Sequence, residues 1–554
     1  MKKNREAGVC RKGNGACGAL LACLLLAGAA WPPSGAAQTA ASPAPARSAP
    51  PAAAHASRPA GVDWFEGDVA DAFTQAAASG KPVFLYWGAV WCPPCQELKA
   101  TVFQRRDFLE RLKLFVPVYL DGDAAGAQSW GERFHVSGYP SVLVLRADQK
   151  EMERVSGGMD LSRYAEVLDL ALGQERPVGE LLSSFAAGAG AAADDCRRLA
   201  YNAWLQDPAW TEHPDSLGQL ASQLDQAALR CPKAQAAERA RLQMTAVHAA
   251  VESQEKALEG GAAPDAQLQA LLARVPPVLA DRALAMAIGD ALWFQPEGFF
   301  SAAAAQYPGK GAKGRDALRQ RWFAIMDALS GDTRYSAADR LYALRSKLLA
   351  AKALAAGGKV PAALAAVATR RIDEALAREH QPYARSSLVN AALNVLDVLD
   401  DDRRAHDILA GEIETSGYPY YYMADMADLE EKAGHTDAAV QWLARSYQES
   451  QGPATRFQWG VGYVRGLVRM RPQDDAAVRD AALAVLADLD AAGDLHGRNL
   501  RSLQRLQGSL QDWGKDASHA GAMGAFRDRL QAICARVPAG DSAQPACARM
   551  LAAG

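Results

Sequence analysis

The amino-acid sequence predicts an α/β domain near the N-terminus and, after it, a large all-α region. Between residues 62 and 174, short runs of apolar, aromatic and β-branched residues alternate with helical stretches, as in a sheet covered on both sides. From residue 175 to 554, Ala- and Leu-rich stretches alternate with Gly, Pro and Asp, and no convincing strand occurs. A chain of 554 residues is also too long for one compact domain.

The first 37 residues have the order of a secretory signal peptide. A basic stretch precedes an apolar run over residues 18–30, and the small residues at 35–37 fit a cleavage site. The run is shorter than the roughly 20 apolar residues that span a bilayer, so we expect a periplasmic or secreted protein without stable membrane insertion. A retained, uncleaved anchor is the alternative. Residues 38–61 form an Ala/Pro/Ser-rich tract, which predicts a disordered linker.

Within the α/β domain, each expected strand is a short apolar run, and each expected helix follows or precedes a turn residue. Gly80 is expected to end the first helix, Gly157 and Gly158 to form a late turn, and Asp160 to cap the last helix. The expected strands are residues 82–87, 114–120 and 141–145, and the expected helices are residues 69–78, 96–102, 124–134 and 161–172.

The all-α region shows signs of repetition from about residue 333. Ala405 precedes Ala439 by the 34-residue period of tetratricopeptide repeats, and Leu443 and Ser446 fit the second helix of that pattern. The aromatic residue expected at Glu430 is missing. We therefore expect an α-solenoid or an array of helical hairpins, with an irregular all-α bundle as the alternative.

Two cysteines lie between an expected strand and an expected helix, in Trp91-Cys92-Pro93-Pro94-Cys95. Free N–H groups and the helix dipole stabilise a thiolate at a helix N-terminus, and the thiolate is the nucleophile in disulfide exchange. The prolines stiffen the loop without breaking the helix, because the first N–H groups of a helix lack partners in any case. Half of a zinc site or a structural disulfide is the alternative. No second Cys or His pair occurs between residues 62 and 173, so we expect no metal.

This motif resembles the WCxxC active site of the thioredoxin family, and Gly138-Tyr139-Pro140 resembles the family's cis-proline turn. The resemblance covers residues 62–174, and segments 80–83 and 101–103 are more similar to periplasmic thioredoxin-like domains than to the cytosolic protein. It implies a thioredoxin fold in which Cys92 attacks a substrate disulfide and Cys95 resolves the mixed disulfide. It also implies a substrate groove shaped by Pro140, which would be the cis residue, and contacted by Tyr139.

Two departures from the family pattern concern the direction of catalysis. Tyr86 and Pro117 stand where many thioredoxins have a buried Asp and its Lys partner, so the carboxylate that helps deprotonate the resolving thiol is absent. The Tyr86 side chain is interpreted mainly as a core aromatic, and its hydroxyl as a possible neighbour of the site. Glu97 is a candidate replacement base, although a solvated helix position is favoured. We favour reduction of the substrate, but these residues do not determine the direction.

The remaining cysteines agree with export. Cys10, Cys17 and Cys23 fall in the expected signal peptide, which leaves an even number in the mature chain. Besides the dithiol, four remain, and nearest-neighbour pairing would make two structural disulfides in an oxidising compartment, with buried free thiols as the alternative. These candidate pairs are Cys196 with Cys231 and Cys534 with Cys547.

Charge, aromatic content and basic residues bear on the expected partners and cofactors. A formal net charge of −3 does not suggest a nucleic-acid partner, and no phosphate loop or cofactor motif occurs. The aromatic segment 418–423 has two interpretations, the lining of a peptide-binding groove and aromatic filler between helices, and we favour the filler. Arg465 and Arg469 lie one helical turn apart. An anion or partner site is one interpretation, and a solvated helix face is the one that we favour.

These observations predict an exported thiol–disulfide oxidoreductase that acts through Cys92 and Cys95 and needs no cofactor. Its expected partners are protein disulfides, a redox protein that resets the dithiol, and a peptide or protein held by the helical region. The alternative is a helical binding or assembly module in which the thioredoxin-like domain is a redox-passive adaptor.

Overall fold

The computed structural model describes residues 58–155, 163–173, 176–188, 192–293, 296–306, 313–354 and 358–552. The expected signal peptide, most of the expected linker and the turn with Asp160 lie outside these residues. The same is true of residues 174 and 175, where the boundary between the two regions is expected.

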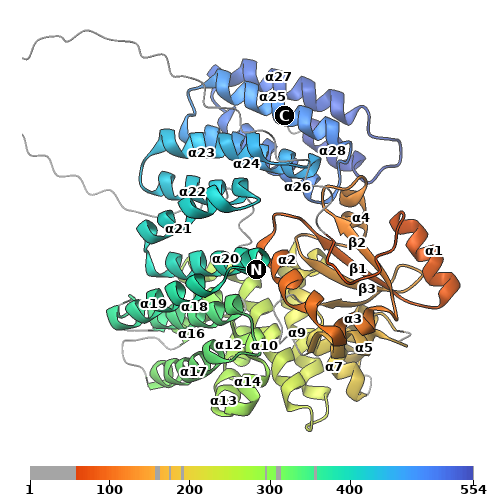
Figure 1. Ribbon diagram of the computed structural model, residues 1–554, viewed down its shortest axis with the longest axis vertical. Helices are drawn as coiled ribbons and strands as arrows, with labels where there is room; N and C mark the ends of the chain where they lie inside the picture. Colours follow the sequence, from red (N-terminus) through yellow and green to blue (C-terminus); the bar gives the residue numbers. More distant parts are fainter. Residues whose placement is uncertain are drawn as a thin grey trace, which may run out of the picture.

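A four-stranded sheet forms the centre of the α/β domain, in the order β2-β1-β3-β4. Strand β1 pairs in parallel with β2 and antiparallel with β3, and β4 adds to β3 in antiparallel register. Figure 1 shows this sheet between the N-terminal and C-terminal parts of the helical region. The strands are β1 (Val83–Gly88), β2 (Val116–Asp121), β3 (Ser141–Leu145) and β4 (Glu151–Val155).

Strand β4 was not expected, because its sequence Glu-Met-Glu-Arg-Val carries charges at positions that turn out to be buried. The side chains of Glu153 and Arg154 are fully buried. Arg198, from the following region, lies 3.6 Å from the Glu153 carboxylate. The Arg154 side chain donates to the carbonyl oxygens of Phe134 and His135. Charges with partners of this kind can occupy a core, and the partners are distant in sequence.

The helices of the α/β domain follow from local signals. Helix α1 begins at Asp68, whose side chain accepts the N–H of Ala70, and ends at Gly80, where φ is 70°. Helix α2 begins earlier than expected, directly after Cys92, and α3 was not expected. The helices are α1 (Val69–Ser79), α2 (Pro93–Ala100), α3 (Arg106–Leu112), α4 (Ala127–Arg133) and α5 (Tyr164–Ala171), with a 3-10 turn at Val102–Gln104.

The rest of the described chain is helical, which confirms the expected fold class of an α/β domain followed by a large all-α region. Consecutive helices pack on one another as hairpins, for example α22 on α23 across Gly434. The helices are α6 (Val178–Ala186), α7 (Ala193–Tyr201), α8 (Pro208–Thr211), α9 (Pro214–Arg230), α10 (Ala236–Ser253), α11 (Glu255–Glu259), α12 (Ala266–Leu272), α13 (Val275–Ala280), α14 (Arg282–Ala287), α15 (Gly289–Trp293), α16 (Pro296–Gln306), α17 (Lys313–Gly331), α18 (Ala337–Leu354), α19 (Ala362–Arg378), α20 (Pro382–Leu399), α21 (Asp402–Thr415), α22 (Pro419–Lys432), α23 (Thr436–Glu449), α24 (Pro453–Met470), α25 (Asp475–Ala492), α26 (Gly497–Trp513), α27 (Ala520–Cys534) and α28 (Gln544–Ala552), with 3-10 turns at Trp204–Gln206 and Ala517–His519.

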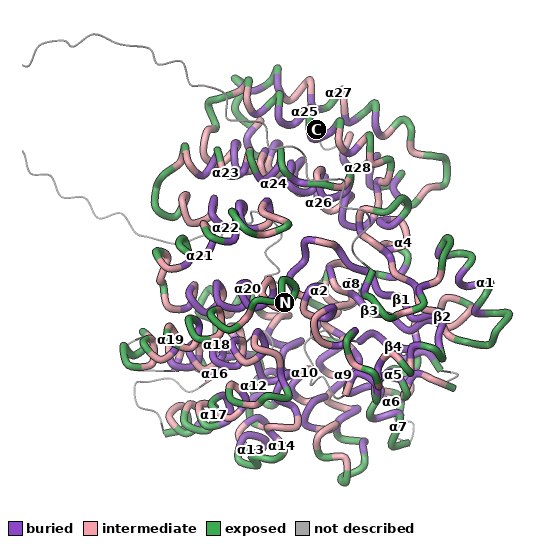
Figure 2. The backbone as a smooth tube through the Cα atoms, in the orientation of Figure 1, coloured by how far each residue is buried: buried purple, intermediate pink, exposed green. Residues whose placement is uncertain are grey.

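The two faces of the sheet contact different parts of the helical region. One face, with Phe84 and Tyr86, belongs to a large apolar core that continues through α6, α7, α9 and α10 as far as α18. The opposite face, with Leu85 and Trp87, packs with α1 and the dithiol loop, and this second core also includes Trp459 from α24. Figure 2 shows buried backbone through the sheet and exposed backbone mainly on outer helices. The α/β domain is therefore held on both sides.

Two disulfides lie in the helical region, and each joins a cysteine to the next cysteine along the chain. Cys196 of α7 is joined to Cys231 at the end of α9, and both are buried. Cys534 at the end of α27 is joined to Cys547 in α28. In the part of the chain that is described, no helix has the length and apolar character needed to cross a membrane.

The buried pair of Glu153 and Arg198 provides a test of how β4 is held. Replacing Arg198 with Met should lower the free energy of unfolding by about 3 kcal/mol, because Glu153 would lose its cationic partner in the core. The double variant Glu153→Leu/Arg198→Met should lose clearly less, since neither member of the pair would then be left without its partner in the core. Urea unfolding of the full chain measures both, and equal losses in the two variants would contradict this account.

Candidate functional site

The dithiol lies where β1 ends and α2 begins. Cys92 is the N-cap residue of α2, and its Sγ accepts the backbone N–H of Cys95 at 3.2 Å. Pro93 and Pro94 occupy the first positions of the helix. The two cysteines form a disulfide with their Cα atoms 5.2 Å apart. The local arrangement therefore agrees with a thiol placed at a helix N-terminus and a second thiol within reach of it.

The Tyr86 hydroxyl lies beside Cys95. It donates to the carbonyl oxygen of Cys95 at 3.4 Å, and the ring is fully buried. Burial raises the pKa of Tyr86 above its ordinary value, so the hydroxyl stays a neutral donor. Gly88 leaves the room for this contact, because a Cβ there would lie 3.2 Å from the Tyr86 Oη and 3.6 Å from the Cys95 Sγ. Tyr86 is thus both a core aromatic and a neighbour of the site.

The Tyr139–Pro140 peptide bond is cis, as the family resemblance implies. The Tyr139 ring is nevertheless buried, with 7% of its surface exposed. It packs on Trp87 with ring centroids 4.4 Å apart, and the Arg498 guanidinium lies 4.7 Å above it. Tyr139 therefore contacts the protein's own helical region in this structure, and its contact with a substrate stays a prediction.

The sulfur atoms are closed off from solvent. Cys92 is 3% exposed and Cys95 is 0% exposed. The indole ring of Trp91 packs edge-on against Trp459 of α24 with centroids 4.5 Å apart, and it stacks on Tyr421 of α22 at 5.9 Å. The segment 418–423 is therefore neither filler between helices alone nor an open groove. We call Trp91, Cys92, Asp123, Tyr139 and Pro140 the dithiol face.

A chain of hydrogen bonds ties Trp91 to the start of α24. The Trp91 Nε1–H donates to the Thr455 Oγ1 at 2.9 Å, and that hydroxyl donates to the Asp123 Oδ2 at 2.6 Å. The Thr455 backbone N–H also donates to the Asp123 Oδ1 at 2.7 Å. Gly452, with φ at 91°, precedes this helix, and a Cβ at Gly452 would overlap the Asp123 carboxyl group. Asp123 therefore supplies the cap that the glycine cannot provide.

Carboxylates cap helix starts across the interface at two further places. At α4 the carboxylate comes from the helical region, and at α26 it comes from the α/β domain. Helix α4 begins at Gly126, and its first N–H groups, of Gln128 and Ser129, donate to the Asp494 Oδ2 at 3.0 and 3.3 Å. Helix α26 begins next to His496, and the Gly497 N–H donates to the Glu132 Oε2 at 3.0 Å. Each region thus supplies carboxylates that cap helices of the other, and we call these contacts the reciprocal caps.

His496 holds the reciprocal caps together. Its Nδ1 lies 2.8 Å from the Asp494 Oδ1 and 2.9 Å from the Ser129 Oγ, and its Nε2 lies 2.9 Å from the Asp541 Oδ1. The hydrogen bond to Asp494 raises the pKa of His496 to about 9, against partial burial and with a further contribution from Asp541. A histidine that is protonated at neutral pH is a cationic clamp and not a general base.

Three residues that were expected to face solvent make side-chain contacts within the protein. Glu97 contacts Ser387 of α20 in a mostly buried setting, and burial raises the pKa of its carboxyl group, so the solvated position favoured from the sequence is wrong. Arg469 makes a double hydrogen bond to Glu431, and the Arg465 Nε donates to Ser509. These arginines join helices to one another.

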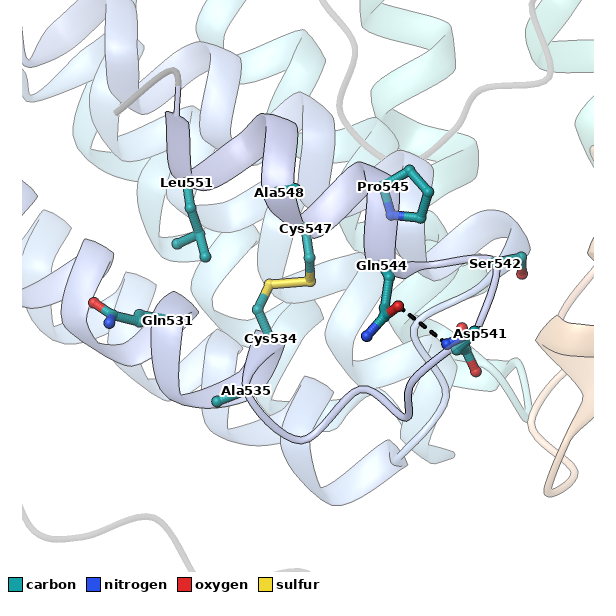
Figure 3. A pocket seen from close by; sticks show the side chains of 11 residues that line it. Gln531, Cys534, Ala535, Asp541, Ser542, Gln544, Pro545, Cys547, Ala548 and Leu551 are labelled. Atoms are coloured by element: carbon teal, nitrogen blue, oxygen red, sulfur yellow. Dashed lines mark hydrogen bonds between the residues drawn. A yellow bond between two sulfur atoms is a disulfide. The ribbon is translucent and has the colours of Figure 1, made fainter.

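A surface pocket lies beside the Cys534–Cys547 disulfide, between the ends of α27 and α28 (Figure 3). Gln531 and Leu551 form part of its wall, and a hydrogen bond from the Gly540 N–H to the Gln544 side chain closes one end. Its one charged lining residue, Asp541, already bonds His496. Among the residues that the structure describes, no cluster of His, Cys, Asp and Glu is suited to hold a metal ion.

The dithiol and the proline turn were predicted from the sequence, but the residues of the interface around them were not, namely Asp123, Thr455, Trp459, Asp494 and Arg498. One signal was available. Helices α4 and α24 begin after glycines, which have no side chain for a cap. A helix start without a local cap indicates that its N–H groups find partners elsewhere.

Comparison with known proteins supports the α/β domain. Residues 63–147 match a protein-family model described as thioredoxin-like. The matched range contains β1, β2 and β3, the dithiol and the cis-proline turn. No curated protein matches the chain. The α/β domain is thus a thioredoxin-like domain.

The raised pKa of His496 predicts how docking depends on pH. Folded His496 binds its proton up to about pH 9, whereas unfolded histidine releases it near pH 6.5. Its stabilising contribution is therefore complete below about pH 6.5 and is lost as the pH rises through 9. We expect wild-type stability, measured by urea unfolding, to fall more between pH 7 and 9.5 than that of His496→Gln.

Other titrating groups contribute equally to the free energy of unfolding of wild type and of His496→Gln, so their contributions cancel in the difference between the two proteins. Lys99 is one of them, because its burial lowers its pKa to about 8 and gives the opposite trend with pH. A difference between the two proteins that is constant from pH 7 to 9.5 would contradict the charged clamp.

Proposed function

We propose that this protein is an exported thiol–disulfide oxidoreductase that exchanges disulfides with protein substrates through Cys92 and Cys95. The observation that carries the proposal is the placement of the dithiol at the N-terminus of α2, in a domain that matches a thioredoxin-like family model and has a cis proline at 140. No cofactor is needed, because both reacting groups belong to the chain.

The reaction follows from the two positions. In the reduced protein, the Cys92 thiolate attacks a substrate disulfide, so that a Cys92–substrate bond forms and one substrate sulfur leaves as a thiolate that takes up a proton. Cys95 then loses its proton and attacks the Cys92 Sγ, which releases the second substrate thiol and leaves the Cys92–Cys95 disulfide. Two electrons pass from the dithiol to the substrate. A partner dithiol must reduce the protein again.

Reduction of the substrate is the direction that we propose. In this direction the departing substrate thiolate can take up the Cys95 proton, so the resolving step does not require the buried carboxylate whose place the neutral Tyr86 hydroxyl takes. About 30 mV in reduction potential corresponds to roughly 1.4 kcal/mol, so contacts of this size decide the direction.

A second candidate function is a binding or assembly module with a redox-passive thioredoxin-like domain. The burial of both sulfur atoms in the docked structure favours it. The reduction potential of Cys92–Cys95 separates the two candidates. An exchanging dithiol should equilibrate with the potentials of other exchange proteins, whereas a structural disulfide should resist reduction below about −300 mV.

Single cysteine variants test the proposed exchange. Cys92→Ser should abolish reduction of insulin disulfides, because the attacking thiolate is removed. Cys95→Ser should accumulate mixed disulfides, because Cys92 can still attack but the adduct is not resolved. Non-reducing gel electrophoresis and mass spectrometry of the adducts measure both effects, and trapping in cells identifies the substrates.

The double variant Cys534→Ser/Cys547→Ser is the control, since its sulfurs lie outside the dithiol face, and it should keep exchange. Exchange by Cys92→Ser at the wild-type rate would contradict the proposed function.

A further inference from the structure

The dithiol face is covered by one continuous part of the chain, helices α22–α28, which we call the C-terminal arm. Helix α22 contributes Tyr421, α24 contributes Thr455 and Trp459, and α26 contributes Arg498. Together these side chains lie on Trp91 and Tyr139. A thiolate must approach a disulfide sulfur directly, so a protein substrate cannot reach Cys92 while the arm is in place.

The thioredoxin-like domain also contacts α20 through Glu97 of α2, but its contacts with α6–α10 and with the arm differ in kind. On the side of α6–α10, the domain shares one large apolar core with the helical region, and separating these parts would expose that core. On the side of the arm, aromatic side chains of α22 and α24 pack against the dithiol loop, and the reciprocal caps and Arg498 lie around them. Water can replace polar partners of this type, so this contact is the one that can open while the domain stays folded.

The contact between the arm and the dithiol face also contains polar groups that would be more stable when hydrated. Burial raises the pKa of Asp123 to about 6, although Thr455 donates two hydrogen bonds to it. The Tyr420 hydroxyl is buried and has no hydrogen-bond partner among the described residues. Both groups favour an opened state in which they are hydrated. An array of stacked helices contacts mainly its neighbours and can bend along its length, which allows the arm to move.

We propose that the C-terminal arm is a lid that closes the dithiol face, with the bonds among Trp91, Thr455 and Asp123 as its latch. In the closed state, the Cys92–Cys95 pair is protected from thiols and disulfides. In the open state, Trp91, Cys92 and the Tyr139–Pro140 turn become accessible to a protein substrate. This inference rests on the proposed function, because it assumes that Cys92 must meet a disulfide partner.

The experiment measures how fast dithiothreitol reduces Cys92–Cys95 in the full-length protein, by timed alkylation and peptide mass spectrometry. Thr455→Val keeps the shape of the side chain but removes the hydroxyl bonds to Trp91 and to the Asp123 Oδ2, while the backbone N–H bond to Asp123 remains. We expect it to accelerate reduction by about tenfold, which corresponds to about 1.4 kcal/mol in favour of opening. Thr455→Ser retains the hydroxyl and should reduce at the wild-type rate.

Two controls show that the change is local. Thr415→Val makes the same substitution at an exposed position of α21 and should leave the rate unchanged. The buried Cys196–Cys231 disulfide should stay oxidised in every variant, because it lies in the core that does not open. Amide hydrogen exchange should rise at residues 454–459 in Thr455→Val, where the backbone N–H of Thr455 loses its closed-state environment.

The outcomes separate the lid from the proposed function. Equal reduction rates in wild type and Thr455→Val would overturn the lid. Fast reduction of Thr455→Val by dithiothreitol, together with no reduction of insulin by this variant, would support the lid but contradict the exchange of protein disulfides. Reduction of insulin by wild type and Thr455→Val at the same rate would support the proposed function and contradict the lid.

Discussion

The docking of the helical region on the dithiol face depends on a constraint that every α-helix carries, the unpaired N–H groups of its first turn. In this protein, helices α4, α24 and α26 do not satisfy these groups with their own N-cap side chains. Asp494, Asp123 and Glu132 supply the carboxylates, each from the opposite region. A negative charge at a helix start is also favoured by the helix dipole, so the two regions stabilise each other reciprocally.

The interface with the helical region lies directly beside the dithiol. Trp91 directly precedes Cys92, and its indole N–H donates to Thr455 of α24. A displacement of α24 would therefore change the surroundings of Trp91 and of the adjacent Cys92.

Much of the thioredoxin-like domain could be predicted, because its signals are local. Short apolar runs marked β1, β2 and β3, and the spacing of Cys92 and Cys95 marked the start of α2. Strand β4 could not be recognised, since Glu153 and Arg154 look like surface residues until Arg198 and distant carbonyl oxygens are placed beside them. Glu97 and Arg469 were misjudged for the same reason, as a charged side chain in sequence carries no record of its partner.

The sequence by itself determined the fold class, the dithiol, the proline turn and the expectation of export, because each depends on residues that are close together in the chain. The tertiary structure alone decided what lies over the dithiol. Trp91 and Thr455 are 364 residues apart, and Gln128 and Asp494 are 366 apart. Contacts over such distances depend on how the whole helical array curves back, and no local pattern of side chains encodes that curvature.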